Sequence, residues 1–350
     1  MICEDYPVPE FMKREDNTAR FAFVTLLMLN DSYLPGVLML AYALKKQQSQ
    51  ADLVCLVSHE ISEGAREALY LLYDRVIEVN KTFISYGRTQ KRQHTPFVLT
   101  RLNALRLGAD GDLGCCYEKI GLLDADLLPI KYYDHLFRLK TPAGVINEHK
   151  DYFIEYDACG NYVLPSDFAH TGTWRWHCEY GSICGHGQPI PKRVTDRVCT
   201  DPSNMGIHGA IFMIKPDMRE FQAIQGELSQ SKICRRIGEQ YPWPDMQYLT
   251  QRWSGYWTNV DLRFCGFKGY PTLSVLFGTH YAGIKPWQLD RSRKCWQWVR
   301  YEDFRYWFRI YNQMVRQDYP KLCKYPSLKK LLRCIHKLQG GRGAREQGGI

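Results

Sequence analysis

Two aspartates that follow an apolar run have the clearest capacity for chemistry in this sequence. Asp124 and Asp126 interrupt the segment Leu122-Leu-Asp-Ala-Asp-Leu-Leu-Pro129. Two ionised carboxylates cannot remain unpaired in a dry core, because their desolvation costs more than the neighbouring leucines return. Such a pair at the end of a strand suits a hard divalent cation that also holds a diphosphate. Solvated aspartates at a strand end, or carboxylates that cap a helix, are the alternative interpretation.

The elements that must position this pair are predicted from the hydrophobic pattern. The apolar run over 20–29 is rich in β-formers and is typical of a strand buried on both faces. A helical period over 33–48, a strand over 52–58, a helix over 61–73 and a strand over 75–80 follow. This alternation is the opening of a parallel α/β sheet. Ligands bind at the carboxyl ends of such strands, which is where the two aspartates fall.

The rest of the chain continues this alternation around one unusual stretch. Residues 149–206 have few aliphatic runs and many Trp, Tyr, His, Gly, Cys and Pro residues, so we interpret them as an irregular insertion. Strands are predicted at 119–130, 144–147, 207–216, 260–267 and 273–277, and helices at 96–107, from about 217, at 244–253, 302–316 and 327–337.

Composition excludes several classes of protein. The chain has 350 residues, of which 45% are hydrophobic and 24% charged, so disorder is excluded as its main state. No stretch of about 18 apolar residues occurs, so we expect no membrane-spanning helix. The N-terminus lacks the apolar run of a secretory signal. We therefore expect a cytoplasmic protein whose 13 cysteines are reduced thiols.

The net charge of +9 is concentrated at one end of the chain. Residues 291–350 contain 15 Lys and Arg against 4 Asp and Glu, while the remainder contains 31 against 33. The charge therefore does not indicate a protein that binds a specific nucleic acid. The basic segment 327–338 could touch an anionic membrane surface weakly. A solvated amphipathic helix that packs on the body is the favoured interpretation.

Six segments form an ordered set of motifs. The two most specific are the Asp-Ala-Asp strand and a closing His-x-x-Gly-x-Lys-Pro-Trp. In chain order, the six segments are 21–45, Thr100-Arg-Leu-Asn103, 117–130, 208–212, 244–249 and 278–287. Together they resemble the glycogenin-like glycosyltransferases, the retaining, nucleotide-sugar-dependent transferases of glycosyltransferase family 8. The resemblance covers about residues 20–290.

This resemblance implies a fold and an activity. The implied fold is GT-A, an α/β domain with a mostly parallel central sheet flanked by helices, over 20–290. A polar lead at 1–19 and a helical, basic extension at 291–350 would flank it. The implied activity is transfer of a hexose from a UDP-sugar, UDP-glucose being the expected donor, to a glycan or protein hydroxyl. Mn²⁺ is the expected metal, since oxygen-rich coordination with one imidazole suits it better than Mg²⁺. A homodimer is left open.

The same resemblance assigns the metal and donor residues. Asp126 and His280 resemble the protein ligands of the divalent ion, and Asp124 would share contact with the ion and the ribose. Tyr33 could stack on the uracil, a contact worth about 1–3 kcal/mol per base in other nucleotide sites. The remaining residues expected to contact the donor are Leu26, Asn30, Arg101, Ala125, His208, Gly209, Gly283 and Lys285.

Residues on the sugar and acceptor side depart from the family pattern. Asp245 and Gln247 are expected to contact the transferred sugar or to act near the reaction centre, together with the first aspartate of the pair. The family has Asp-Gln-Gly here, whereas in this chain Met246 stands at the amide position. Ile207 and His208 stand where many members have Asn and a small residue. Arg101, on the donor side, replaces the usual Lys.

Alternatives remain at three points. His170, His177, Cys178, Cys184, His186 and Cys199 could supply a zinc clip in the insertion, although a Cys- and aromatic-rich flap over the acceptor site is favoured. A non-catalytic nucleotide-sugar-binding module with a basic docking tail is the alternative function, and the intact metal set favours an enzyme. A nucleotidyltransferase would need a Gly-rich phosphate loop after the first strand, and 26–33 contains none.

Overall fold

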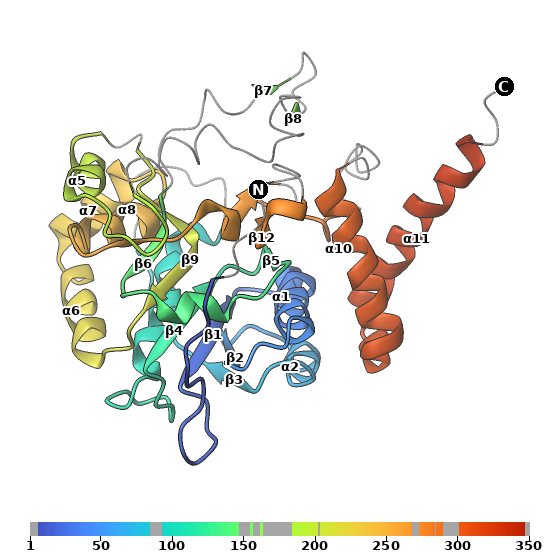
Figure 1. Ribbon diagram of the computed structural model, residues 1–350, viewed down its shortest axis with the longest axis horizontal. Coiled ribbons are helices and arrows are strands. Elements are labelled where there is room, and N and C mark those ends of the chain that lie inside the picture. Colours follow the sequence, from blue (N-terminus) through green and yellow to red (C-terminus); the bar gives the residue numbers. More distant parts are fainter. Residues whose placement is uncertain are drawn as a thin grey trace.

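A seven-stranded sheet forms the centre of the computed structural model (Figure 1). Of these strands, β9 alone is antiparallel to its neighbours, so the predicted α/β class with a mostly parallel sheet is confirmed. Across the sheet, the strands are β10 (Thr258–Asn259), β6 (Ala143–Ile146), β9 (Ile207–Ile214), β4 (Lys119–Leu123), β1 (Phe21–Leu27), β2 (Asp52–Val57) and β3 (Arg75–Glu78). The structure describes residues 6–84, 93–146, 155–156, 162–163, 184–201, 204–267, 273–283, 285–289 and 301–346.

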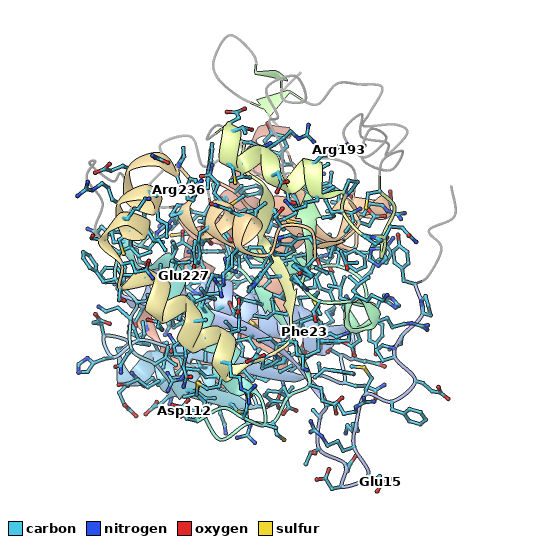
Figure 2. All side chains as sticks on the ribbon, turned by 90° about the vertical axis from the view of Figure 1, so that its left-hand side faces the viewer. Glu15, Phe23, Asp112, Arg193, Glu227 and Arg236 are labelled. Carbon is cyan, nitrogen blue, oxygen red and sulfur yellow. The ribbon has the colours of Figure 1, made fainter. Side chains whose placement is uncertain are left out.

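Helices cover both faces of the sheet (Figure 1). Figure 2 looks onto one of these sides, with Arg193, Glu227 and Arg236 labelled on its helices. One face is covered by α1 (Leu34–Lys46) and α2 (Glu63–Leu69), and the other by the 3₁₀ segment η2 (Thr95–Leu107), α5 (Lys192–Thr200), α6 (Met218–Leu228), α7 (Ser231–Gln240) and α8 (Pro244–Arg252).

The side chains of β1 alternate between two hydrophobic clusters, as the period of a strand requires. Phe21, Phe23 and Leu27 pack in the cluster that contains α1 and α2. Ala22 and Val24 pack in the cluster that contains η2, α6 and α8. The strand is therefore buried on both faces, as its continuous apolar run predicts.

A turn at the two aspartates joins the central sheet to a smaller one. The strand predicted over 119–130 is divided into β4 and β5 (Leu127–Pro129), so its single-strand assignment was wrong. The small sheet has the order β11 (Gly266–Phe267), β12 (Gly278–His280) and β5. Because β12 runs antiparallel to β5 and pairs His280 with Leu127, the closing motif lies beside the acidic turn.

Three other local predictions differ from the structure. The predicted α-helix over 96–107 is the 3₁₀ segment η2. The strands predicted at 260–267 and 273–277 are mainly the 3₁₀ turns η4 (Leu262–Cys265) and η5 (Leu273–Val275). Within the described part of the insertion, α5 and the short pair β7 (Glu155–Tyr156) and β8 (Tyr162–Val163) are regular.

Two C-terminal helices lie on the same side of the sheet as α1 and α2, beyond α1 (Figure 1). They are α10 (Glu302–Gln313) and α11 (Pro326–Glu346), joined by η7 (Met314–Asp318) and η8 (Pro320–Lys324). Apolar side chains of both helices belong to the same cluster as α1, and the end of α11 extends away from the sheet (Figure 1). Among the described helices, none is both long and apolar enough to cross a membrane.

The segment 327–338 lays its apolar side on the body. Leu328, Leu331, Leu332 and Ile335 are buried, while basic residues of the segment are exposed. This arrangement agrees with the favoured interpretation of a solvated amphipathic helix. A membrane contact would have only the basic side of this segment to use.

Candidate functional site

Asp124, Asp126 and His280 meet where β4 ends. Each offers one ligand atom, and these three atoms lie within 4.8 Å of one another. The Asp124 amide donates to the carbonyl of Ala210 at 3.1 Å, which ties the turn to β9. Two carboxylates and one imidazole are a suitable donor set for Mn²⁺. The residues present therefore fit the predicted ion.

Asp126 is held by two basic side chains. Its Oδ1 lies 3.2 Å from His280 Nε2, and its Oδ2 contacts the ammonium of Lys285. Lys285 also donates to the carbonyl of Tyr281 at 2.7 Å, and the Tyr281 amide donates to the carbonyl of Asp126 at 2.9 Å. Burial would raise the pKa of Asp126, but Lys285 and His280 outweigh it and hold the pKa below its usual range.

Arg101 lies between two carboxylates from different parts of the chain. Its Nη2 is 2.9 Å from Asp124 Oδ1, and its Nη1 donates to Asp245 Oδ2 at 3.1 Å. Burial raises the pKa of Asp124, Arg101 opposes that rise and Asp126 adds to it. A guanidinium fork can contact two carboxylates at once, which an ammonium does less well. The departure from the family's Lys thus links the acidic pair to the predicted catalytic aspartate.

The site is more open at Asp124 than at its other members. The side chain of Asp124 is 35% exposed, against 11% for Asp126 and 8% for Lys285. A ligand would therefore enter past Asp124. Gly209 lies on the same side, since a Cβ there would meet Arg101 Nη1 at 3.3 Å and Asp245 Oδ2 at 3.4 Å.

A close approach joins the acidic turn to the start of α1. A Cβ on Gly36 would lie 2.5 Å from the carbonyl oxygen of Ala125 and 2.4 Å from the indole of Trp287. Only glycine allows three segments to meet at this distance. The ring of Tyr33 lies edge to face with Trp287, with centroids 5.5 Å apart. Tyr33, which is predicted to stack on the uracil, is thus positioned by Trp287 of the closing motif.

The other predicted donor residues lie on β1 and on two turns. Asn30 is exposed, and its Oδ1 accepts from the amide of Ser32 at 2.9 Å, as a helix N-cap does. Leu26 is half-buried in the second cluster. Gly283 has a φ of 85°, in the left-handed region that favours glycine. Their contacts with a donor remain predictions.

Gln247 is packed inside the protein. It is fully buried, and its Nε2 donates to the carbonyl of Asn204 at 2.9 Å. Its Oε1 accepts from the amide of Trp243 at 2.9 Å, at the start of α8. These contacts favour a role in holding α8. Asp245, whose side chain is 14% exposed, is the member of this motif that faces Arg101.

Sequence reasoning missed one side chain beside the site. Cys265 Sγ lies 3.6 Å from His208 Nδ1, and the ring of His208 is edge to face with that of His280. His208, Cys265 and His280 form a second group of potential metal ligands. No local spacing in the sequence marks Cys265, because its partners are distant along the chain.

The described members of the alternative zinc clip have other contacts. Cys184 donates to the carbonyl of Pro189 at 3.2 Å. The Nδ1 of His186 accepts from the amide of Asp261 at 3.0 Å, and Cys199 is exposed. Its other proposed ligands, His170, His177 and Cys178, lie outside the described residues.

Known proteins resemble this chain in sequence. No protein-family model matches it. An uncharacterized protein of Acanthamoeba polyphaga mimivirus is 25% identical over 323 residues, which cover 86% of this chain and 96% of that protein. Glycogenin-1 of Oryctolagus cuniculus is 32% identical over 121 residues, 33% of each chain. Galactinol synthase 1 of Ajuga reptans is 25% identical over 280 residues, 77% of this chain and 74% of that protein. The chain is therefore similar to glycogenin-like glycosyltransferases, as its motifs predict.

A solved structure is similar over much of the chain. It is that of a galactosyltransferase in complex with donor and acceptor sugar analogs, and it covers 81% of this chain and 94% of its own, at 15% identity and a TM-score of 0.46. A likeness at this level carries no argument about function.

Proposed function

We propose that this chain is a glycosyltransferase that moves a hexose from a UDP-sugar, with UDP-glucose as the expected donor, to an acceptor hydroxyl. The observation that carries the proposal is the meeting of two carboxylates and an imidazole beside two buried cations. Each charged group is costly to bury, so packing alone would not bring these groups together from distant segments. They are the carboxylates of Asp124, Asp126 and Asp245 and the cations of Arg101 and Lys285. The similarity to glycogenin and galactinol synthase supports the same class of reaction.

The chain's own side chains would divide the donor between them. Asp124, Asp126 and His280 would hold a divalent ion, Mn²⁺ being the expected one. When bound, this ion would neutralise the charge that develops on the leaving UDP. Lys285 would bind the diphosphate from the Asp126 side, and Arg101 from the Asp124 side. Tyr33 would stack on the uracil.

The proposed reaction retains the configuration at the anomeric carbon, and the acceptor attacks on the face of the sugar from which UDP leaves. Asp124, Asp126 and Asp245 each lie against a basic side chain, so none of the three is placed as an unengaged nucleophile. The leaving phosphate would then assist deprotonation of the acceptor hydroxyl. Kinetic trapping of a covalent glycosyl-enzyme on any of these carboxylates would oppose this course.

Release of UDP from a panel of UDP-sugars in the presence of Mn²⁺ tests the proposal. We expect metal-dependent release from one sugar, and its loss in Asp126→Ala and His280→Ala. Asp112→Ala is the matched control, because Asp112 is an exposed carboxylate paired with Arg106. If the native protein neither binds UDP with Mn²⁺ nor turns over any sugar, the proposal fails, and a non-catalytic module becomes the better account.

A further inference from the structure

His208, Cys265 and His280 bring a second set of ligand atoms together beside the acidic pair. Each offers one atom, and the three lie within 4.8 Å of one another. We propose that they form a second metal site, which takes a thiophilic divalent ion such as Zn²⁺ and shares His280 with the carboxylates. A thiolate and two imidazoles are donors that Zn²⁺ favours, whereas Mn²⁺ favours oxygen.

The distance within this set fits tetrahedral zinc. Zn–N bonds of about 2.0 Å and Zn–S bonds of about 2.3 Å place the two donor atoms about 3.5 Å apart. Cys265 Sγ lies 3.6 Å from His208 Nδ1. The rings of His208 and His280 meet at 82° with centroids 4.8 Å apart. The set would therefore close around an ion through small side-chain movements.

The three ligands come from elements that the core holds in place. His208 lies on β9, Cys265 ends η4 and His280 ends β12. His208 and His280 are 6% exposed and Cys265 is fully buried. Ligands that are locked by packing lose little side-chain freedom when an ion binds, which favours binding.

Entry of an ion has one identifiable cost. The amide of Ala210 donates to His208 Nδ1 at 3.0 Å, and ligation through this nitrogen would replace that hydrogen bond. Formation of the metal–sulfur bond also releases the thiol proton of Cys265 to solvent. We therefore expect an ion that exchanges with solution, in contrast to one that is retained through purification.

Sharing of His280 makes the two sites interdependent. The Nε2 of His280 lies 3.2 Å from Asp126 Oδ1, and one nitrogen cannot ligate two ions. Where Zn²⁺ held by His208 and Cys265 takes this nitrogen, it would draw His280 from Asp126. Zn²⁺ would then oppose Mn²⁺ at the acidic set. This consequence rests on the proposed donor site, whereas the metal site itself does not.

Titration of the full-length, chelator-treated protein with Co²⁺ alone tests the metal site. Cobalt bound to a thiolate gives a near-ultraviolet charge-transfer band, and we expect one equivalent of this band, which Zn²⁺ abolishes. Cys265→Ala should remove the band, and His208→Asn should weaken Co²⁺ binding by about 100-fold or more, since changes outside the ligand shell already cost 10–100-fold. Cys55→Ala is the matched control, because Cys55 is an equally buried free thiol on β2.

Circular dichroism of each variant separates loss of a ligand from loss of the fold. Absence of the band in the native protein, or its full retention in folded Cys265→Ala, would overturn the metal site. If the band behaves as expected but the protein shows no Mn²⁺-dependent UDP binding, the proposed second metal site stands and the proposed donor site is wrong. If both are present, Zn²⁺ should raise the Mn²⁺ concentration that UDP binding requires in native protein but not in Cys265→Ala.

Discussion

The acidic turn and the C-terminal helices both bury side chains in the body, but different forces hold them. At the turn, charged side chains are matched with one another, as Asp126 is with Lys285 and Asp124 with Arg101. In the helices, aromatic side chains pack on one another. The rings of Trp307 and Tyr311, for example, stack with centroids 5.0 Å apart and an interplanar angle of 10°. A buried charge needs its particular partner, whereas an aromatic cluster needs mainly volume and shape.

The two regions meet at Trp287. Its indole is 5.9 Å from that of Trp307, centroid to centroid, and it also lies against the close approach between Gly36 and Ala125. We therefore expect substitutions in the two regions to affect different properties of the protein. Substitutions in the helices should reduce stability, while those at the turn should remove ligand binding even where stability is restored.

The largest loss of stability is expected from Trp307→Ala on α10. Trp307 is 1% exposed, and truncation of a fully buried Trp costs about 3–5 kcal/mol of unfolding free energy. Denaturant unfolding measures this cost, and the exposed Arg309→Ala should stay within about 0.5 kcal/mol of the native value. Loss of UDP binding in Trp307→Ala at a temperature where the variant is folded would contradict the separation of roles.

Asp126→Asn should reduce both stability and binding. It leaves the buried ammonium of Lys285 without its carboxylate, at a cost of about 3 kcal/mol. The double variant Asp126→Asn/Lys285→Met should regain much of that stability, because no buried ammonium is left without its carboxylate, yet it should not regain Mn²⁺-dependent UDP binding. Recovery of binding together with stability would mean that Asp126 acts only in the fold.

Gly36→Ala should disturb the point where the two regions meet. Its Cβ would lie 2.5 Å from the backbone oxygen of Ala125, and such overpacking costs about 1–3 kcal/mol. Gly226→Ala on α6 is the control, since nothing lies within 4 Å of its Cβ and alanine should stabilise the helix by about 0.5–1 kcal/mol. Equal thermal stability of the two variants would show that the close approach relaxes freely.

A smaller effect is expected from pH, through His186. Burial lowers the pKa of His186 to about 4, with Asp261 opposing and Arg263 and His135 adding to the shift. In the unfolded chain, the imidazole of His186 binds a proton near pH 6.5. The free energy of unfolding is therefore unaffected by His186 above that pH and decreases as the pH falls towards 4. The loss at pH 5 is at most about 2 kcal/mol. His186→Gln should flatten the pH dependence of the melting temperature between pH 7 and 5, and an unchanged slope would contradict it.

Elements with strong local patterns could be predicted from the sequence. The continuous apolar run of β1 and a helix that begins at about 217 were predicted from local features, and both agree with the structure, in which Asp217 caps α6. Of the strands predicted at 260–267 and 273–277, only β11 forms among the described residues, and the 3₁₀ turns beside it are packed through aromatic side chains. Phe264 and Phe277 stack at 4.4 Å there, and Tyr6 from the N-terminal lead packs beside them.

The site could be predicted only in part. Asp126 and His280 belong to recognisable motifs, and the pairing of β5 with β12 brings them together. The fork of Arg101 between two carboxylates and the position of Cys265 could not be predicted. Both depend on where side chains from distant segments arrive, and no spacing along the chain encodes that arrival.

Calorimetric titration of UDP into the native protein and into His280→Ala, each with and without Mn²⁺, tests the central claim most directly. His280 lies on β12, and its removal leaves two other contacts of the acidic turn in place, those of Asp124 with Ala210 and of Asp126 with Lys285. We expect UDP to bind the native protein only with Mn²⁺ and this binding to be lost in the variant. UDP binding that is independent of Mn²⁺, or equal in both proteins, would contradict it.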